Sequence, residues 1–312
     1  MARSTAEANL AEMLQQSLTS ILGAPPDPAP LSPQVLGVLE RDHYRREHIK
    51  YQVSPNQWSY AYLLIPKGVN LPCPAIICHH GSGNFAAGKE EMVDETRPSI
   101  GVELARLGYV VMAPDAFGYG ERRSPNSSGA AYDAAYTLQH YTVLLLRGET
   151  MLRHLLSDIS RAVDYLLTRP EVDGARLGFI GQSYGARMAL WAAAFEPRLI
   201  ATVAHGSLMS YRETVRQGNW FQIEFVVPRL MQVADLHDIL SLVAPRPFLL
   251  STIQGDAYST DAAEIYQRAL VAYQRLGVPQ RLAHYVYPRG SGFEPAMRYK
   301  AYTWLNSWLK PY

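Results

Sequence analysis

A serine between two glycines is the strongest chemical motif of the sequence. Gly181-Gln182-Ser183-Tyr184-Gly185 fits G-x-S-x-G, in which a nucleophilic serine stands on a sharp turn between a strand and a helix. The apolar run LGFIG leads into the motif and the Ala-rich run ARMALWAAAF follows it. The glycines allow close backbone approach, and a helix N-terminus favours developing negative charge. We predict that Ser183 is a nucleophile; the alternative is an ordinary turn with a capping serine.

A glycine-rich segment could bind the oxygen of a reacting carbonyl. His79-His80-Gly81-Ser82-Gly83 comes at the end of the apolar run 73–79. Backbone N–H groups of such a loop, together with the N–H of Tyr184, can form an oxyanion hole. We expect Gly81, Ser82 and Tyr184 to supply these donors. His80 is expected to shape the loop and is a candidate for substrate contact, and a plain glycine turn is the alternative.

An aspartate stands where the acid of a catalytic triad is expected. In hydrolases with a nucleophile elbow, the chain order is serine, then acid, then histidine. Asp256 lies in STIQGDAYS, just after the apolar run 247–253. We predict that it is the acid, and the alternative is a cap for the next helix. Asp261 is the rival acid, but it lies further into the expected helix start.

Alternating strands and helices are expected to position these residues. The runs CPAIICH, YVVMAPD, LGFIG and PFLLSTI are nearly continuous apolar, as in strands of a parallel sheet that is covered on both faces. The fold class is therefore α/β, with a mostly parallel eight-stranded sheet flanked by helices. Strands are expected at about 46–53, 58–65, 73–79, 109–114, 176–181, 200–204, 247–253 and 282–287, and helices at about 4–22, 98–107, 150–168, 184–195, 259–276 and 295–309.

Two longer segments interrupt this alternation. Residues 115–148 and 206–245 both leave from the carboxyl ends of expected strands, where open α/β sheets bind ligands. We expect them to form the walls of a pocket. Arg122 could meet an acidic part of a substrate, or form an ordinary surface ion pair. Trp220 could line the pocket, or anchor its segment in the core.

Together these motifs resemble the α/β-hydrolase superfamily, and within it the branch of dienelactone hydrolases and acetyl xylan esterases. The resemblance covers about residues 45–310 and includes APDAFGYGER, LVAPRPFLL and the C-terminal YPRGSGFEPAMRYKAYTWLNSWL. It implies an α/β-hydrolase fold and a Ser–Asp–His triad that cleaves carboxylic esters without a metal or organic cofactor. We expect the substrate to be an ester of a small or medium organic molecule.

The expected position of the histidine departs from the family pattern. The family commonly carries Gly-His-Gly-Phe after the last strand, whereas this chain has Gly290-Ser291-Gly292-Phe293. A serine hydroxyl cannot take the proton of Ser183 near neutral pH, so turnover should fall by about 10⁴–10⁶. Ser291 is either an engineered or recent change, or natural in a protein that only binds its ligand or acts as a lyase or cyclase. Phe293 is a candidate for substrate contact.

Another histidine could replace the missing base. His205 is better placed than His284, because it ends the expected strand 200–204 beside the nucleophile strand, and it is also a candidate for substrate contact. His237 lies in the segment 206–245 and could fold inward; the alternative for each is a structural or surface histidine. A substitute base must come within about 2.6–3.2 Å of Ser183. His284 is seven residues before Ser291 along a strand, or about 23 Å when extended, and does not reach it easily.

Composition excludes several classes of protein. With 312 residues, 48% apolar and 18% charged, the chain is not disordered. Its net charge of +1 gives no broad attraction to nucleic acid or an anionic membrane. Cys73 and Cys78 lie five apart on one expected strand, too far to pair, which fits a reducing compartment. No run of 18 apolar residues and no signal-peptide core is present, so we expect a cytoplasmic protein without a membrane or nucleic-acid partner.

The chain is expected to form one main domain. Residues 1–33 are an N-terminal helical arm and Pro-rich linker, and residues 34–312 are the α/β-hydrolase domain. The apolar stripe of the arm either packs on that domain or contacts another copy. The sequence leaves a homo-oligomer open.

Overall fold

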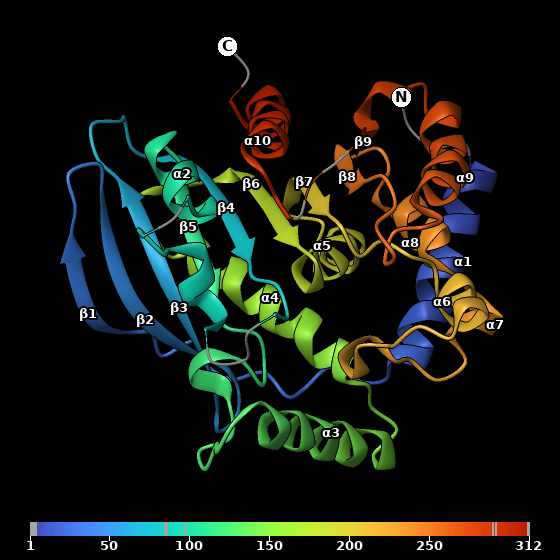
Figure 1. Cartoon of the computed structure of the whole chain (residues 1–312), viewed down its shortest axis with the longest axis horizontal. Coiled ribbons are helices and arrows are strands. Elements are labelled where there is room, and N and C mark those ends of the chain that lie inside the picture. The colour runs from blue at the N-terminus through green and yellow to red at the C-terminus, as the bar shows by residue number, and fades with distance from the viewer. Residues whose placement is uncertain (1–4, 84–86, 97, 289, 291, 311–312) are drawn as a thin grey trace.

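One nine-stranded sheet runs through the protein, with helices on both faces (Figure 1). The computed structural model describes residues 5–83, 87–96, 98–288, 290 and 292–310. The strands are β1 (Gln34–Glu40), β2 (Tyr44–Ser54), β3 (Gln57–Pro66), β4 (Cys73–His79), β5 (Val110–Pro114), β6 (Val172–Gln182), β7 (Leu199–His205), β8 (Phe248–Ile253) and β9 (Leu282–Tyr287).

The helices lie mostly between the strands. They are α1 (Thr5–Leu22), α2 (Ile100–Arg106), α3 (Ala130–Leu146), α4 (Met151–Leu167), α5 (Tyr184–Phe195), α6 (Tyr211–Gln217), α7 (Leu230–Val233), α8 (Leu236–Val243), α9 (Ala262–Arg275) and α10 (Pro295–Leu309). Short 3₁₀ turns are η1 (Gly88–Met92), η2 (Gly120–Arg122), η3 (Ile223–Phe225) and η4 (Pro279–Arg281).

The sheet has the mostly parallel topology that the sequence predicts. Its strand order is β1-β2-β3-β5-β4-β6-β7-β8-β9. Pairs from β1 to β3, and β3 with β5, are antiparallel, and the remaining pairs are parallel. The expected count of eight strands was wrong, because it omitted β1. This edge strand buries no side chain fully, so QVLGVLE lacks the buried run or clean alternation that marks a strand.

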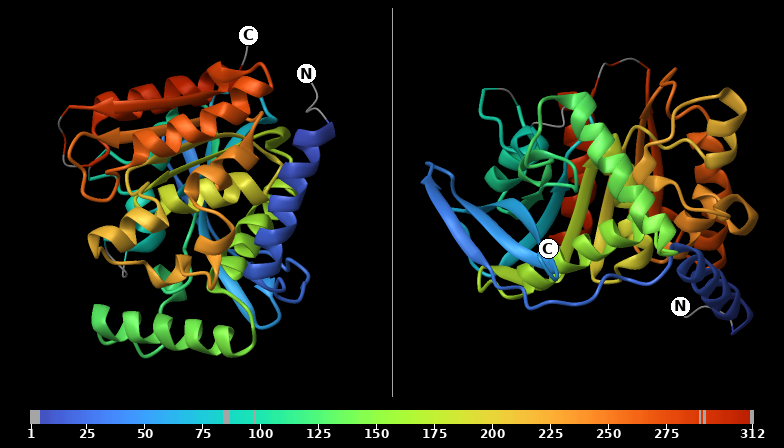
Figure 2. Two further views of the ribbon diagram at one scale, coloured as in Figure 1. Left: turned by 90° about the vertical axis from the view of Figure 1, so that its right-hand side faces the viewer. Right: turned by 90° about the horizontal axis from the view of Figure 1, so that it is seen from below.

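Two hydrophobic cores cover the two faces of the sheet. One core contains buried side chains of α4, α5, α8 and α9, and the other contains those of α2 and α10. Figure 2 shows these helices in layers on either side of the strands. The carboxyl ends of β4, β6, β7 and β8 therefore meet at one edge of the sheet, where ligands of such folds bind.

The two interrupting segments contain helices of their own. The segment 115–148 includes η2 and α3, and the segment 206–245 includes α6, η3, α7 and α8. Helix α1 packs on the main domain, since Leu18 and Leu22 are fully buried, although Leu10 and Met13 stay exposed. Both cysteines are buried and free. Among the described residues, none of the helices has the length and apolar character that a membrane crossing requires.

Candidate active site

The turn between β6 and α5 has the geometry of a nucleophile elbow. Ser183 has a backbone φ of 55°, a value that residues other than glycine rarely adopt. A Cβ on Gly181 would lie 2.0 Å from the carbonyl oxygen of Gly185, and a Cβ on Gly185 would lie 2.4 Å from that of His79. Glycine is therefore required at both positions, and the strand–turn–helix arrangement expected from the sequence is present.

The glycine-rich loop after β4 lies directly against the serine. A Cβ on Gly81 would be 3.7 Å from the Cβ of Ser183. The Ser82 hydroxyl accepts a hydrogen bond of 3.0 Å from Gln222 in the segment 206–245. Tyr184 begins α5, so its backbone N–H has no partner within the helix. Gly81 and Ser82 line a cavity together with Ser183, and their role as oxyanion donors with Tyr184 stays a prediction.

His80 fixes the conformation of this loop through two hydrogen bonds. It is fully buried, its Nδ1 donates to the Gly81 carbonyl at 2.7 Å, and its Nε2 accepts from the Ala116 N–H at 3.1 Å. Burial lowers the pKa of His80, which keeps the ring neutral and this tautomer fixed. Because both nitrogens are occupied, His80 shapes the loop and does not reach a substrate.

Asp256 and Ser183 line one cavity of about 330 Å³. The Asp256 carboxylate accepts from the Tyr258 N–H at 3.0 Å and from the Ser259 hydroxyl at 2.6 Å, which orients it. Asp261, the rival acid, is the N-cap residue of α9 and accepts from the Ser210 N–H instead. The structure thus separates the two aspartates that the sequence could only rank.

The loop after β9 borders the same cavity. Gly290 and Gly292 both line it together with Asp256. Ser291 itself lies outside the described residues, so its place in the site of the base stays a prediction.

The other histidines are engaged elsewhere. His205 lines the cavity, but its Nδ1 lies 2.8 Å from the Ser251 hydroxyl and its second partner is the backbone of Gly292. Burial lowers its pKa to about 4, and its ring stacks on Phe293 at 4.2 Å. His237 lies 3.2 Å from Asp238, and His284 bonds to Thr252. Within the described part of the chain, the Ser183 hydroxyl bonds to no histidine.

The partner of the nucleophile is a residue that sequence reasoning missed. The hydroxyls of Ser183 and Ser207 lie 3.3 Å apart. Ser207 has a φ of 51°, and Arg187 donates to its carbonyl at 3.4 Å and to that of Met209 at 3.3 Å. Arg187 thus holds the segment that carries Ser207 through two backbone carbonyls. No local pattern marks Ser207, because only the pairing of β6 with β7 brings it to Ser183.

Three further candidates differ in their placement. Phe293 lines a cavity at Ser183, as expected. Arg122 is buried and paired with Asp158 at 2.6 Å, away from both cavities that Ser183 lines. Trp220 is 90% exposed and lines neither of these cavities, although Phe225 of the same segment is fully buried. Their local sequences could not show which side chains turn inward.

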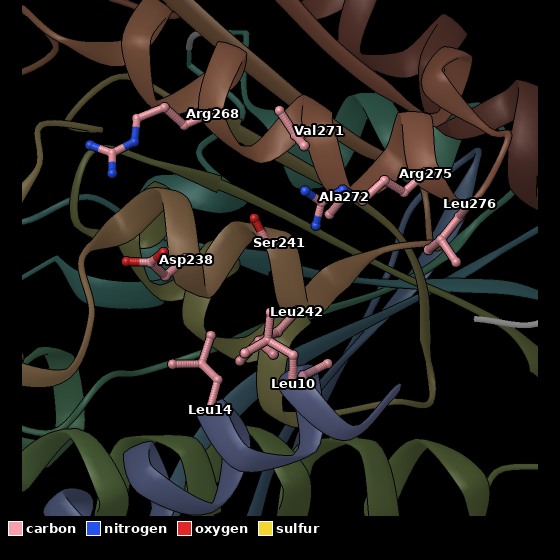
Figure 3. Close-up of a pocket in the computed structure, with 11 residues that line it drawn as sticks. Leu10, Leu14, Asp238, Ser241, Leu242, Arg268, Val271, Ala272, Arg275 and Leu276 are labelled. Atoms are coloured by element: carbon pink, nitrogen blue, oxygen red, sulfur yellow. The ribbon is translucent and has the colours of Figure 1, made fainter. Parts of the chain in front are cut away.

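Two cavities meet at Ser183. The first, of about 440 Å³, contains the oxyanion loop residues 81–83, and the second, of about 330 Å³, contains Asp256. Among the described residues, Gln182 and Ser183 are the two that line both cavities. A separate groove lies between α1, α8 and α9, walled by Leu10, Leu14 and Leu242, and it includes none of the site residues (Figure 3). No cluster of three or more potential metal ligands occurs among the described residues.

Comparison with known proteins agrees with this geometry. The model of the abhydrolase family matches residues 4–302. The chain belongs to the abhydrolase family. This abhydrolase is 30% identical to YtaP of Bacillus subtilis strain 168, provisionally named a hydrolase, over 95% of this chain and 98% of that protein.

Solved structures share the fold of this abhydrolase at lower identity. A Bacteroides fragilis NCTC 9343 protein, provisionally named an acetyl xylan esterase, superposes with a TM-score of 0.74 at 19% identity, covering 99% of this chain and 86% of that one. A glucuronoyl esterase from Solibacter usitatus has a TM-score of 0.67 at 16% identity, covering 95% and 91%. The chain is therefore an α/β-hydrolase, of a family whose neighbours include esterases.

Proposed function

We propose that this abhydrolase is built to cleave a carboxylic ester, with Ser183 as nucleophile and Asp256 as the acid of the triad. The observation that carries the proposal is the strained Ser183, which lies between the oxyanion loop and the Asp256 carboxylate. The names of the neighbouring structures, an acetyl xylan esterase and a glucuronoyl esterase, favour an ester of a carbohydrate. We also propose that Ser291 stands in the place of the base, so that turnover is strongly impaired.

The chemistry follows from this arrangement. The Ser183 oxygen attacks the ester carbonyl carbon, and backbone N–H groups of Ser82 and Tyr184 stabilise the charge on the carbonyl oxygen. A base on the Asp256 side takes the serine proton and gives it to the departing alcohol oxygen, leaving an acyl-serine. Water then attacks the acyl carbon and releases the acid. The step that Ser291 cannot perform is the proton transfer, because its hydroxyl is not a base near neutral pH.

A second function has one observation in its favour. The Ser183 hydroxyl bonds to the hydroxyl of Ser207, which holds the nucleophile without activating it. A protein that binds an ester-like ligand, or acts as a lyase or cyclase, would tolerate this arrangement. It would form no acyl-serine, and a histidine at position 291 would not create an esterase.

The deciding experiment restores the base. The variant Ser291→His should hydrolyse 4-nitrophenyl acetate at least tenfold faster than the unchanged chain, with a bell-shaped or rising pH profile near the ordinary pKa of histidine. The double variant Ser291→His/Ser183→Ala is the control and should lose this gain. Intact mass after incubation should show an acyl adduct that needs Ser183. A gain below tenfold, with no adduct, would refute the esterase proposal in favour of the binder.

A further inference from the structure

The two cavities at Ser183 must hold different halves of an ester. The acid of a serine hydrolase orients the base that protonates the departing alcohol, so the alcohol lies in the cavity that contains Asp256. The oxyanion loop borders the other, larger cavity. That cavity of about 440 Å³ therefore takes the acyl group. This assignment rests on the proposed function.

The walls of this acyl cavity are polar. Ser99 is 4% exposed, and none of the residues that the structure describes forms a hydrogen bond with its hydroxyl. It is the N-cap residue of α2, yet its side chain makes no capping bond, although serine at that position usually does. A buried hydroxyl without a partner costs free energy. A ligand group in the cavity that hydrogen-bonds to the Ser99 hydroxyl would remove this cost.

The other residues that line this cavity suit a ligand with hydroxyl groups better than a charged ligand. Ser82 keeps its hydroxyl at the cavity, bonded to Gln222. One acidic and one basic side chain, Glu91 and Arg298, also line it. Arg298 is already paired with Glu103 at 2.8 Å. Because opposite charges line the same cavity and the cation has its own partner, a neutral group with several hydroxyls matches the site.

The cavity also has an apolar side and the size for a ring. Met92, Ile100 and Phe293 line it beside the polar residues. Its volume lies within the range of about 300–1,000 Å³ that small-molecule sites have. An acetyl group would leave most of this space to water, and an alkyl chain would leave the buried Ser99 hydroxyl unsatisfied. We propose that the acyl cavity is a binding site for a hydroxylated ring acid, so that the sugar-like half of the ester is its acyl half, and that Ser99 determines this specificity.

Matched methyl esters test the proposal, since all of them release methanol. The Ser291→His variant is given the methyl esters of D-galacturonic acid and of cyclohexanecarboxylic acid, and kcat/KM is measured as methanol released. The hydroxylated ring should be preferred at least tenfold. Equal rates, or faster release from the cyclohexane ester, would overturn the proposal. So would faster hydrolysis of an acetylated xylose, which places its sugar on the alcohol side.

Substitution of Ser99 supplies a second readout. Ser99→Ala should lower kcat/KM for the galacturonate ester about three- to tenfold, the effect of one neutral hydrogen bond, and leave that for the cyclohexane ester unchanged. Ser241→Ala, a serine in the groove of Figure 3, is the matched control and should alter neither. Equal losses for both esters would contradict a specificity role. The comparison of the two esters in the unsubstituted cavity does not depend on the folding of any Ser99 variant.

A binding measurement tests this inference independently of the proposed esterase activity. The chain with its own Ser291 is titrated calorimetrically with the same two esters under conditions of slow turnover. Tighter binding of the galacturonate ester, weakened by Ser99→Ala, supports the acyl cavity even if Ser291→His hydrolyses nothing and the esterase proposal fails. Equal binding of both esters overturns the inference even if hydrolysis is observed.

Discussion

A buried glutamate near the active site should make stability depend on pH. Glu224 lies on η3 in the segment 206–245 and is 4% exposed. Burial raises its pKa from 4.5 to about 7, and only its own backbone N–H opposes this shift. Its charge also raises the pKa of Tyr184 at the elbow. Ionised Glu224 therefore disfavours the folded state beside the candidate nucleophile.

The size and sign of the effect follow from proton linkage. Below pH 4.5 the carboxyl is protonated in both the folded and the unfolded chain, and it brings no penalty. As pH rises from 4.5 to 7, the unfolded chain loses its proton first, so the folded state loses stability. Above pH 7 the loss is complete at about 3 kcal/mol, which is the shift of the pKa multiplied by about 1.4 kcal/mol per unit.

Urea denaturation of Glu224→Gln at pH 5 and pH 8 measures this effect. Glutamine resembles the protonated acid, so the stability of the variant relative to the unchanged chain should rise by about 2–3 kcal/mol from pH 5 to pH 8. Glu264→Gln on the exposed side of α9 is the matched control and should show no such trend. A difference between Glu224→Gln and the unchanged chain that is the same at both pH values would refute the reasoning.

Two other substitutions follow from close packing and buried charge. Gly185→Ala places a Cβ 2.4 Å from the His79 carbonyl oxygen and should destabilise the fold by about 1–3 kcal/mol. Gly83→Ala, whose Cβ would meet open space, is the control and should not destabilise it. Equal thermal unfolding midpoints for the two variants would contradict this reasoning. Asp115→Ala removes one of the two carboxylates that pair with the buried Lys89, since Asp115 lies 2.7 Å and Glu121 2.5 Å from its ammonium. It also leaves the buried backbone N–H of Lys89 without its acceptor, so it should cost about 1–3 kcal/mol in urea denaturation, and an unchanged stability would contradict this.

Local motifs explain why much of the site could be predicted. The turn at Ser183 needs glycine on both sides because the backbone of β4 and α5 approaches it within contact distance. The glycines that this turn requires lie within two residues of Ser183, so the motif can be recognised from the sequence alone. The place of Asp256 in one cavity with Ser183 could be expected for a related reason, because a residue just after a buried strand lies at the carboxyl edge of the sheet.

Residues that meet through long-range pairing could not be found this way. Ser207 reaches Ser183 because β6 and β7 are neighbours, and Ser99, which precedes α2, borders the larger cavity at Ser183. Neither belongs to a motif. The exposed Trp220 and the buried Arg122 show the same limit, since side-chain direction within a long segment depends on packing with distant elements.

The sequence by itself indicated the class of fold, the strand–turn–helix at Ser183, two candidate aspartates and the absence of histidine at position 291. These follow from local periodicity, glycine geometry and chain order, which act over a few residues. Only the tertiary structure showed that Asp256 lines a cavity with Ser183 while Asp261 caps α9, and that Ser207 is the hydroxyl partner of Ser183 among the described residues. Those features arise where elements distant in the chain pack together. The contacts that stabilise them form between segments, so no single segment of the sequence indicates them.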